Sequence, residues 1–255
     1  MKRAVKIIKD SFSTNKKLLA GLIIVLCVSI YEIIDSSLKT MSYYYGTPCI
    51  LDIMVDTQFY NNMIMLCIPL IVLYVVRCKK NCLYMQSIVR HKTRSSILKQ
   101  QIIESFIYAT IFTSFLMITQ ILVAIIRKVV FLNWSETASV YYHMTGHVST
   151  QKVSIIILVI VEIFLLYISK FMVLFVFVDV LQWYPKYIFL IFILLMMPLA
   201  LLFTTGKDIF YEGLSVDWNS ITEPMSIWKY FLVIICIFSE YQIGKTIIKE
   251  KDIFL

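Results

Sequence analysis

Two ionisable residues, Glu162 and Lys170, interrupt a long apolar run at residues 153–178. Charged groups are costly at membrane depth, so both are candidates for lining a translocation path. They lie two helical turns apart, roughly 12 Å along a helix axis, and cannot pair directly with each other. Lys170 can instead extend its ammonium group to the interface. For Glu162, a place on the path and a neutral hydrogen-bonded contact between helices stay equally open.

The remaining candidates for chemistry are few. His143 and His147 have the spacing of two metal ligands, but Gly146 predicts that the helix stops between them, and a third ligand is missing. The chain has no nucleophile elbow, P-loop or Gly-rich phosphate cradle. We therefore predict no catalytic residue, no metal and no directly bound cofactor. Glu104, near one end of an apolar run, is expected to be exposed at the interface.

The segment 77–101 is the most basic part of the chain, with seven Lys or Arg residues and no Asp or Glu. It lies between two apolar runs, and Lys and Arg are retained on the cytoplasmic side of membranes. Part of it has helical spacing, which predicts a short helix along the membrane that docks a soluble partner. An ordinary topology loop that binds nothing is the equally weighted alternative. The helical face consists of Leu83, Tyr84, Ser87, Ile88 and His91.

The composition of the chain indicates which kind of secondary structure would position these residues. Of 255 residues, 60% are hydrophobic and only 16% are charged, where a soluble domain has about 25% charged residues. Apolar runs near 20 residues long are typical of bilayer spans. We predict one all-α integral membrane domain over residues 1–255. Its six transmembrane helices are expected at 18–34, 60–76, 102–126, 153–178, 187–203 and 227–243.

The distribution of charge orients these spans. Basic residues cluster at 1–17, at 77–101 and near the C-terminus, which predicts that both termini are cytoplasmic. Arg127, Lys128 and Lys152 lie on the predicted outer side, against this rule, but are outnumbered. The net charge of +8 is explained by these loops, so we predict no nucleic-acid partner.

The segments outside the spans have local signals of their own. Residues 1–15 form an amphipathic pattern suited to the membrane interface. Residues 35–59 are predicted to be an acidic outer loop. A short outer helix is expected at 134–145, with Gly146 as its stop. Gly244 is expected to end the sixth span.

Together these features resemble the membrane subunit of an ABC-2-type exporter. The likeness covers nearly the whole chain through the order of its elements: a basic amphipathic helix, six spans and a basic helical loop after the second span. Residues 88–94, IVRHKTR, followed by Lys99, resemble the Arg-x-x-Ser/Thr-Arg…Lys pattern of small permeases for peptide or bacteriocin export or immunity in Gram-positive bacteria. The chain departs from that family in lacking a clear pair of re-entrant outer helices after the fifth span.

The resemblance implies a function for each part. Residues 1–15 would be the elbow helix and 83–93 the coupling helix of a type V exporter-like fold. The protein would be a non-catalytic permease in a bacterial plasma membrane, forming the path for a peptide or other amphipathic substrate. It would pair with a second permease copy or paralogue and with ATPase subunits, which would hold ATP and Mg²⁺. The ATPase contact would comprise Leu83, Tyr84, Ser87, Ile88, Arg90, Thr93, Arg94 and Lys99.

Two alternatives stay open beside this reading. A stand-alone membrane immunity or interaction protein would act without any ATPase. An intramembrane enzyme would need His, Glu, Cys or Asp clustered at one depth, and the sequence does not predict such a cluster.

Overall fold

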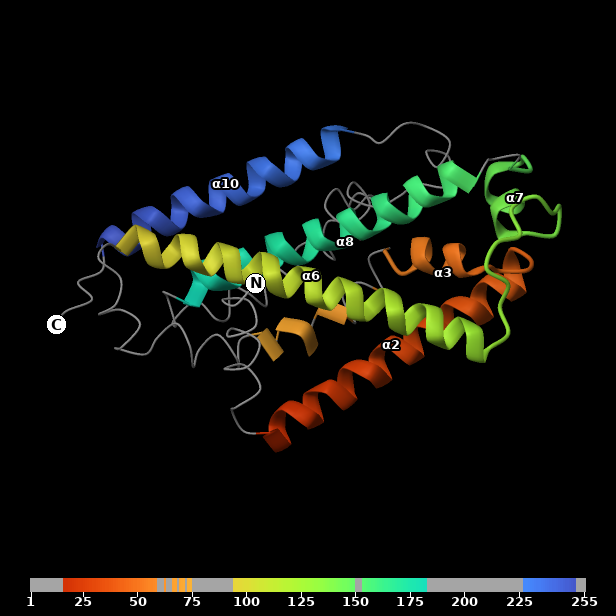
Figure 1. The fold of residues 1–255 in the computed structure, drawn as a ribbon, viewed down its shortest axis with the longest axis horizontal. Helices are drawn as coiled ribbons and strands as arrows, with labels where there is room; N and C mark the ends of the chain where they lie inside the picture. The colour runs from red at the N-terminus through yellow and green to blue at the C-terminus, as the bar shows by residue number, and fades with distance from the viewer. Residues whose placement is uncertain are drawn as a thin grey trace.

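The computed structural model describes residues 16–58, 62, 66–67, 69–71, 73–74, 94–149, 153–182 and 227–250. These residues form an elongated bundle of four long helices and two short ones (Figure 1). The helices are α2 (Lys16–Tyr44), α3 (Ile50–Asp56), α6 (Arg94–Ile126), α7 (Val140–Thr145), α8 (Val153–Gln182) and α10 (Ile227–Glu250). The all-α prediction is confirmed for this part of the chain.

Two stretches of the described residues are long and apolar enough to cross a membrane. They are Leu98–Ile126, within α6, and Ile156–Val180, within α8. They coincide with the third and fourth predicted spans. The described residues therefore include two candidate membrane-spanning helices.

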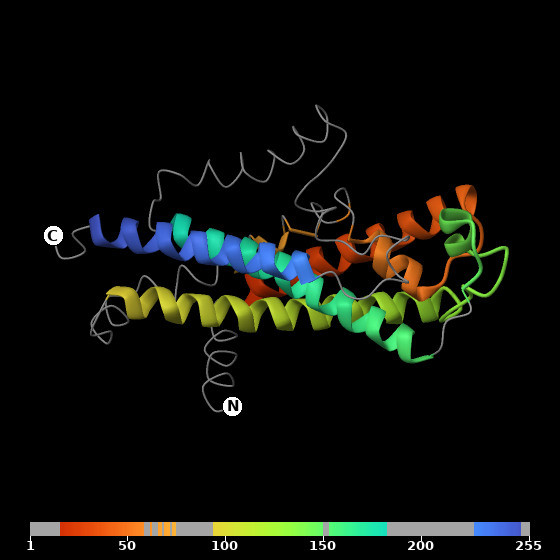
Figure 2. The ribbon, with the colours of Figure 1, turned by 90° about the horizontal axis from the view of Figure 1, so that it is seen from above.

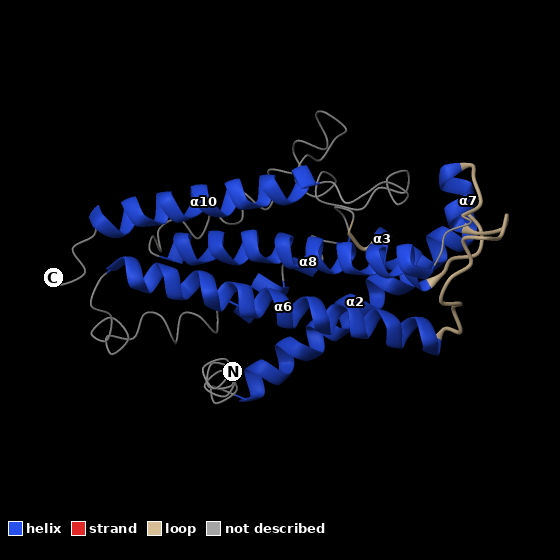
Figure 3. Cartoon of the chain, turned by 45° about the horizontal axis from the view of Figure 1, so that its top comes forward, coloured by secondary structure: helices blue, strands red, loops and turns tan. Residues whose placement is uncertain are grey.

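Helix α8 is the centre of the bundle and packs chiefly against α6 and α10, while α2 packs against α6 (Figures 1 and 2). Helices α2 and α6 run toward the end of the bundle that carries α7, which we call the α7 end. Helices α8 and α10 run in the opposite direction, toward what we call the Gly244 end (Figure 3).

Aromatic side chains at helical spacing explain why α8 is central. Tyr167, Phe171 and Phe175 are fully buried, and each ring stacks on the next because residues four apart share one helix face. The Tyr74 ring stacks on Phe175 with centroids 4.3 Å apart. The opposite side of α8 exposes apolar residues such as Leu158, so apolar side chains lie on both the buried and the exposed side of the helix.

The α7 end differs from the predicted acidic outer loop at 35–59. Helix α2 continues to Tyr44, and residues 50–56 form α3, whose apolar side chains are buried in the bundle. Two acidic residues of this segment have polar partners within the helices, and these contacts explain the difference from the predicted loop. Asp35 pairs with Lys39 one turn along α2, and Asp52 accepts a hydrogen bond from the Cys49 N–H (2.8 Å) at the start of α3.

The predicted stop at Gly146 is confirmed, because this residue ends α7 with a φ of +74°. The helix begins at Val140, later than the predicted residue 134. Ser139 supplies the N-cap by accepting a hydrogen bond from the Tyr142 N–H (3.2 Å). The residues before it lie in a loop, where the Asn133 side chain donates a hydrogen bond to the Thr47 carbonyl at 2.8 Å.

Two expectations at the Gly244 end were wrong. Helix α10 does not end at Gly244 but continues to Glu250. Gly244 is instead a point of close packing, where an added Cβ would lie 3.1 Å from Val180 Cγ2 and 3.2 Å from a Leu98 methyl group. Glu104 is buried rather than exposed, and it accepts a hydrogen bond from the Gln100 side chain at 2.8 Å.

Four predicted elements lie outside the described residues. They are the elbow helix at 1–15, the coupling helix at 83–93, the fifth span at 187–203 and the acidic loop after it at 204–225. Of the second span at 60–76, the described residues are 62, 66–67, 69–71 and 73–74, all of them helical.

The close packing at Gly244 predicts a position-specific effect of size. Replacing Gly244 with Leu forces the new side chain against Leu98 and Val180, and overpacking of this kind costs about 1–3 kcal/mol. We expect Gly244→Leu to lower the temperature of thermal unfolding in detergent. Gly21→Leu is the matched control, because nothing lies within 4 Å of a Cβ there. Equal unfolding temperatures for the two variants would contradict the packing.

Candidate functional site

A buried polar layer surrounds the end of α3. Thr57 and Gln58 follow this helix, and both are fully buried. The last carbonyl groups of a helix lack partners within it, and in an apolar interior they must find them elsewhere. The Met54 carbonyl accepts hydrogen bonds from the hydroxyl groups of Thr57 (3.2 Å) and Tyr167 (3.2 Å).

Side chains from α6 and α8 complete this layer. Gln120 of α6 donates to the Thr57 hydroxyl at 2.6 Å, and Tyr167 of α8 shares a hydrogen bond with the same hydroxyl. Lys170 of α8 donates from Nζ to the Gln58 carbonyl at 2.9 Å. A cation is favoured at the C-terminal end of a helix, where the dipole is negative. The polar layer therefore attaches the end of α3 to both α6 and α8.

The structure gives Lys170 a partner that the sequence did not indicate. Its side chain is only 2% exposed, so the ammonium group lies inside the bundle rather than at the interface. The prediction that Lys170 lines a translocation path stays a prediction. In this conformation its ammonium group holds the backbone of Gln58.

Glu162 lies elsewhere in the bundle and is half-buried. Its electrostatic neighbours are Lys229 and Tyr230, both near the start of α10. The structure therefore does not bring Glu162 and Lys170 together, and each belongs to a different helix contact. The role of Glu162 on a path likewise stays a prediction.

The predicted ATPase contact falls largely outside the described residues. This applies to Leu83, Tyr84, Ser87, Ile88, Arg90 and Thr93. Arg94 is the first residue of α6, and Lys99 lies exposed on the same helix. Residues 94–101 of the basic segment are thus part of a helix that continues through the bundle.

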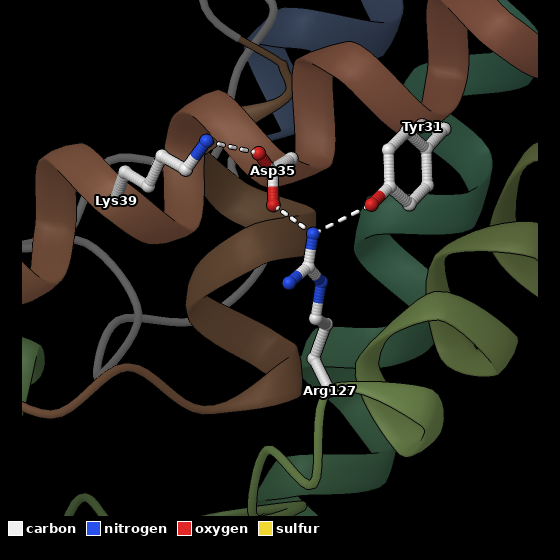
Figure 4. Close-up of polar contacts among 4 residues, drawn as sticks. All are labelled: Tyr31, Asp35, Lys39 and Arg127. Carbon is white, nitrogen blue, oxygen red and sulfur yellow. Dashed lines mark hydrogen bonds and ion pairs between the residues drawn. The ribbon is translucent and has the colours of Figure 1, made fainter.

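A cluster at the α7 end joins α2 to the end of α6 (Figure 4). Arg127 pairs with Asp35 and donates a hydrogen bond to the Tyr31 hydroxyl at 2.6 Å. Asp35 also pairs with Lys39. Arg127 is one of the three basic residues that lie against the charge rule, and its pairing with Asp35 offsets its charge there.

Sequence reasoning missed several buried polar residues. Thr57 and Gln58 were assigned to an outer loop, and Gln120 was not considered. Asp179, near the end of α8, is 1% exposed and accepts hydrogen bonds from Tyr74 and Ser105. The sequence signal that could have identified such residues is their polarity, because an amide or carboxyl group within an apolar run needs a buried partner.

The chemistry of the described residues is that of contacts between helices. Among them, no group of three or more His, Cys, Asp or Glu residues is placed to hold a metal ion. In the part of the chain that the structure describes, the fold and the polar layer define an all-α arrangement with two candidate membrane-spanning helices and a buried helix end held by side chains. Comparison of the chain with protein-family models, with curated proteins and with solved structures gave no match.

The contact between Lys170 and Gln58 predicts a stability effect. Lys170→Met leaves the buried Gln58 carbonyl without this donor, and an unsatisfied buried group costs about 1–3 kcal/mol. We expect a lower thermal unfolding temperature for Lys170→Met and little change for Lys39→Met, whose side chain is 76% exposed. The same unfolding temperature for Lys170→Met and the wild type would show that the contact contributes nothing.

Asp52 predicts a dependence of stability on pH. This residue lies outside both candidate spans, and burial raises its pKa although the Cys49 N–H and the Trp134 indole donate hydrogen bonds to it. A raised pKa means that the folded chain binds the proton more tightly than the unfolded chain does. The contribution is therefore fully present below the unfolded value of about 4 and is lost as the pH rises through the folded value.

Asp52→Asn removes this titration, so we expect the unfolding temperature of the variant to fall less than that of the wild type as the pH rises above about 4. Unfolding curves over a pH series measure the difference. Asp56→Asn is expected to act with the same sign, because burial also raises the pKa of Asp56. Parallel curves for Asp52→Asn and the wild type would contradict the assignment.

Proposed function

We propose that the chain is the non-catalytic membrane subunit of an ATP-driven exporter and forms the path for a peptide or other amphipathic substrate. The observation that carries this proposal is the continuity of α6. Arg94 and Lys99 of the basic segment belong to its first turns, and the same helix continues to Ile126. A soluble partner acting on the basic segment would therefore move a rigid helix that packs along α8.

Exposed apolar surface supports a membrane location. Monomeric soluble proteins rarely expose large contiguous apolar patches, whereas contact with lipid makes such exposure favourable. Helices α6, α8 and α10 each expose several large apolar side chains. They include Ile103, Phe106, Ile118, Leu122 and Ile125 of α6, Ile157, Leu158 and Val161 of α8, and Phe231, Ile234, Ile235 and Phe238 of α10.

The directions of the helices support the six-span topology. In that topology, the first and third spans run outward and the fourth and sixth run inward. Helices α2 and α6 share one direction, and α8 and α10 share the other. The proposal places further crossings at 60–76 and 187–203, both termini in the cytoplasm and the α7 end outside, in a bacterial plasma membrane.

The proposed mechanism follows from these positions. The coupling helix at 83–93 would bind a cleft in a separate ATPase subunit, which supplies ATP and Mg²⁺. Closure of two ATPases would move α6 against α8 in this chain and in a second permease copy or paralogue. Glu162 and Lys170 are proposed to lie along the path, with Lys170 acting through the end of α3 that it holds.

Charge reversal in the basic segment tests the proposal. We expect Arg90→Glu combined with Arg94→Glu to insert normally but to lose ATPase association, because two attractive charges become repulsive. The measurement is the amount of ATPase recovered with the protein from its native membrane in mild detergent. A loss of about tenfold or more corresponds to at least about 1.4 kcal/mol.

Lys249→Glu combined with Lys251→Glu is the matched control, since it reverses two basic residues of the C-terminal segment instead. It is expected to keep the partner. Full recovery of ATPase with the Arg90 and Arg94 variant would contradict the proposal that the basic segment docks an ATPase. Recovery of no ATPase even with the wild type, although ATPases are present in the membrane, would favour a stand-alone immunity or interaction protein.

A further inference from the structure

Asp179 is a buried carboxyl group at the Gly244 end, where three parts of the chain meet around α8. Its side chain is 1% exposed. Its Oδ2 atom accepts hydrogen bonds from the Tyr74 hydroxyl at 2.7 Å and from the Ser105 hydroxyl at 2.6 Å. Tyr74 precedes the basic segment and Ser105 lies on α6 after it, so Asp179 ties both sides of that segment to α8.

Two carboxyl oxygens at this place lack hydrogen-bond partners. They are Oδ1 of Asp179 and Oε2 of Glu240, each buried and without a partner among the residues that the structure describes. Glu240 lies on α10, which packs against α8, and it precedes by one turn Gly244, whose position lies against Val180, the neighbour of Asp179. A proton bound here would remove one of the two charges and turn one of these buried acceptors into a donor.

The surrounding charges do not favour two carboxylates. Glu104, the neighbour of Ser105 on α6, is a third buried carboxyl group at this end. The groups that face Asp179 from the second-span residues and α6 are the Tyr74 and Ser105 hydroxyls and Glu104, and Glu240 faces it from α10. Lys99 and Lys245, two lysines at this end, are both exposed.

An ionised carboxylate inside a protein costs several kcal/mol unless it is well paired. When two carboxyl groups share a buried site, the second ionisation is strongly opposed, and the protons are lost in two steps that belong to the pair. By contrast, Asp35 at the α7 end has two cationic partners and needs no proton to balance its charge.

We propose that Asp179 and Glu240 form a proton-binding site that holds one proton between α8 and α10 at neutral pH. Nearby packing gives the proton a structural role. Gly244 follows Glu240 by one turn and contacts Val180, the neighbour of Asp179. Loss of the proton would place two negative charges next to this close contact, and would separate α8 from α10 at this end.

The site goes beyond the exporter proposal and does not depend on it, since it can be tested on the purified full chain in lipid nanodiscs. Infrared spectroscopy measures the carbonyl band of a protonated carboxyl group directly. We expect the wild type to show this band at neutral pH and to lose part of it as the pH is raised. The variant Asp179→Asn combined with Glu240→Gln is expected to lack the part that titrates.

The control is Glu162→Gln, which removes another carboxyl group of α8 with Lys229 as its neighbour and is expected to keep the Asp179–Glu240 band. A wild-type spectrum without the band at neutral pH would overturn the proposal. A double variant whose band matches the wild type would also overturn it.

Folding of the double variant is itself informative. An amide has nearly the shape of a protonated carboxyl group and carries no charge, so the double variant should fold at neutral pH and lose less stability than the wild type at alkaline pH. Far-ultraviolet circular dichroism and gel filtration measure this. A double variant that fails to fold where the wild type is folded would show that the site needs a charged carboxylate, against the proposal.

Discussion

The buried end of α3 sets a constraint on which the rest of the bundle depends. A helix that stops inside an apolar interior leaves carbonyl groups without partners, and each must be satisfied by protein groups. Here Tyr167 and Lys170 of α8 provide donors, and Gln120 of α6 supports Thr57 between them. This requirement places polar residues at matching depths on two long helices and thereby fixes how α6 and α8 align.

The two ends of the bundle satisfy their acidic residues in different ways. At the α7 end, Asp35 is paired with Arg127 and Lys39, which joins α2 to α6 through opposite charges. At the Gly244 end, Asp179 receives hydrogen bonds from hydroxyl groups and lies near other carboxyl groups. The first arrangement is compatible with an ionised carboxylate, and the second is the basis for proposing a bound proton.

The proposed function connects these contacts through α6. This helix begins in the basic segment, passes Ser105 and Gln120, and ends beside Arg127. A displacement at its first turn would therefore act on three places. They are the proposed proton site, the polar layer at the end of α3 and the pair of Arg127 with Asp35 at the α7 end. A rigid helix with polar contacts at three depths is suited to transmitting motion from one face of a membrane to the other.

Composition and apolar runs alone determined that the chain is helical, and they located the two stretches that the structure shows as candidate spans, because hydropathy and charge are local properties. Gly146 was likewise readable as a helix stop from its residue type. Which side chains contact one another was decided by the tertiary structure. Thr57 looked like part of a loop, Gly244 looked like a stop and Asp179 drew no notice, since burial and packing come from residues distant in the chain. For Asp179 those partners are 74 and 105 residues away.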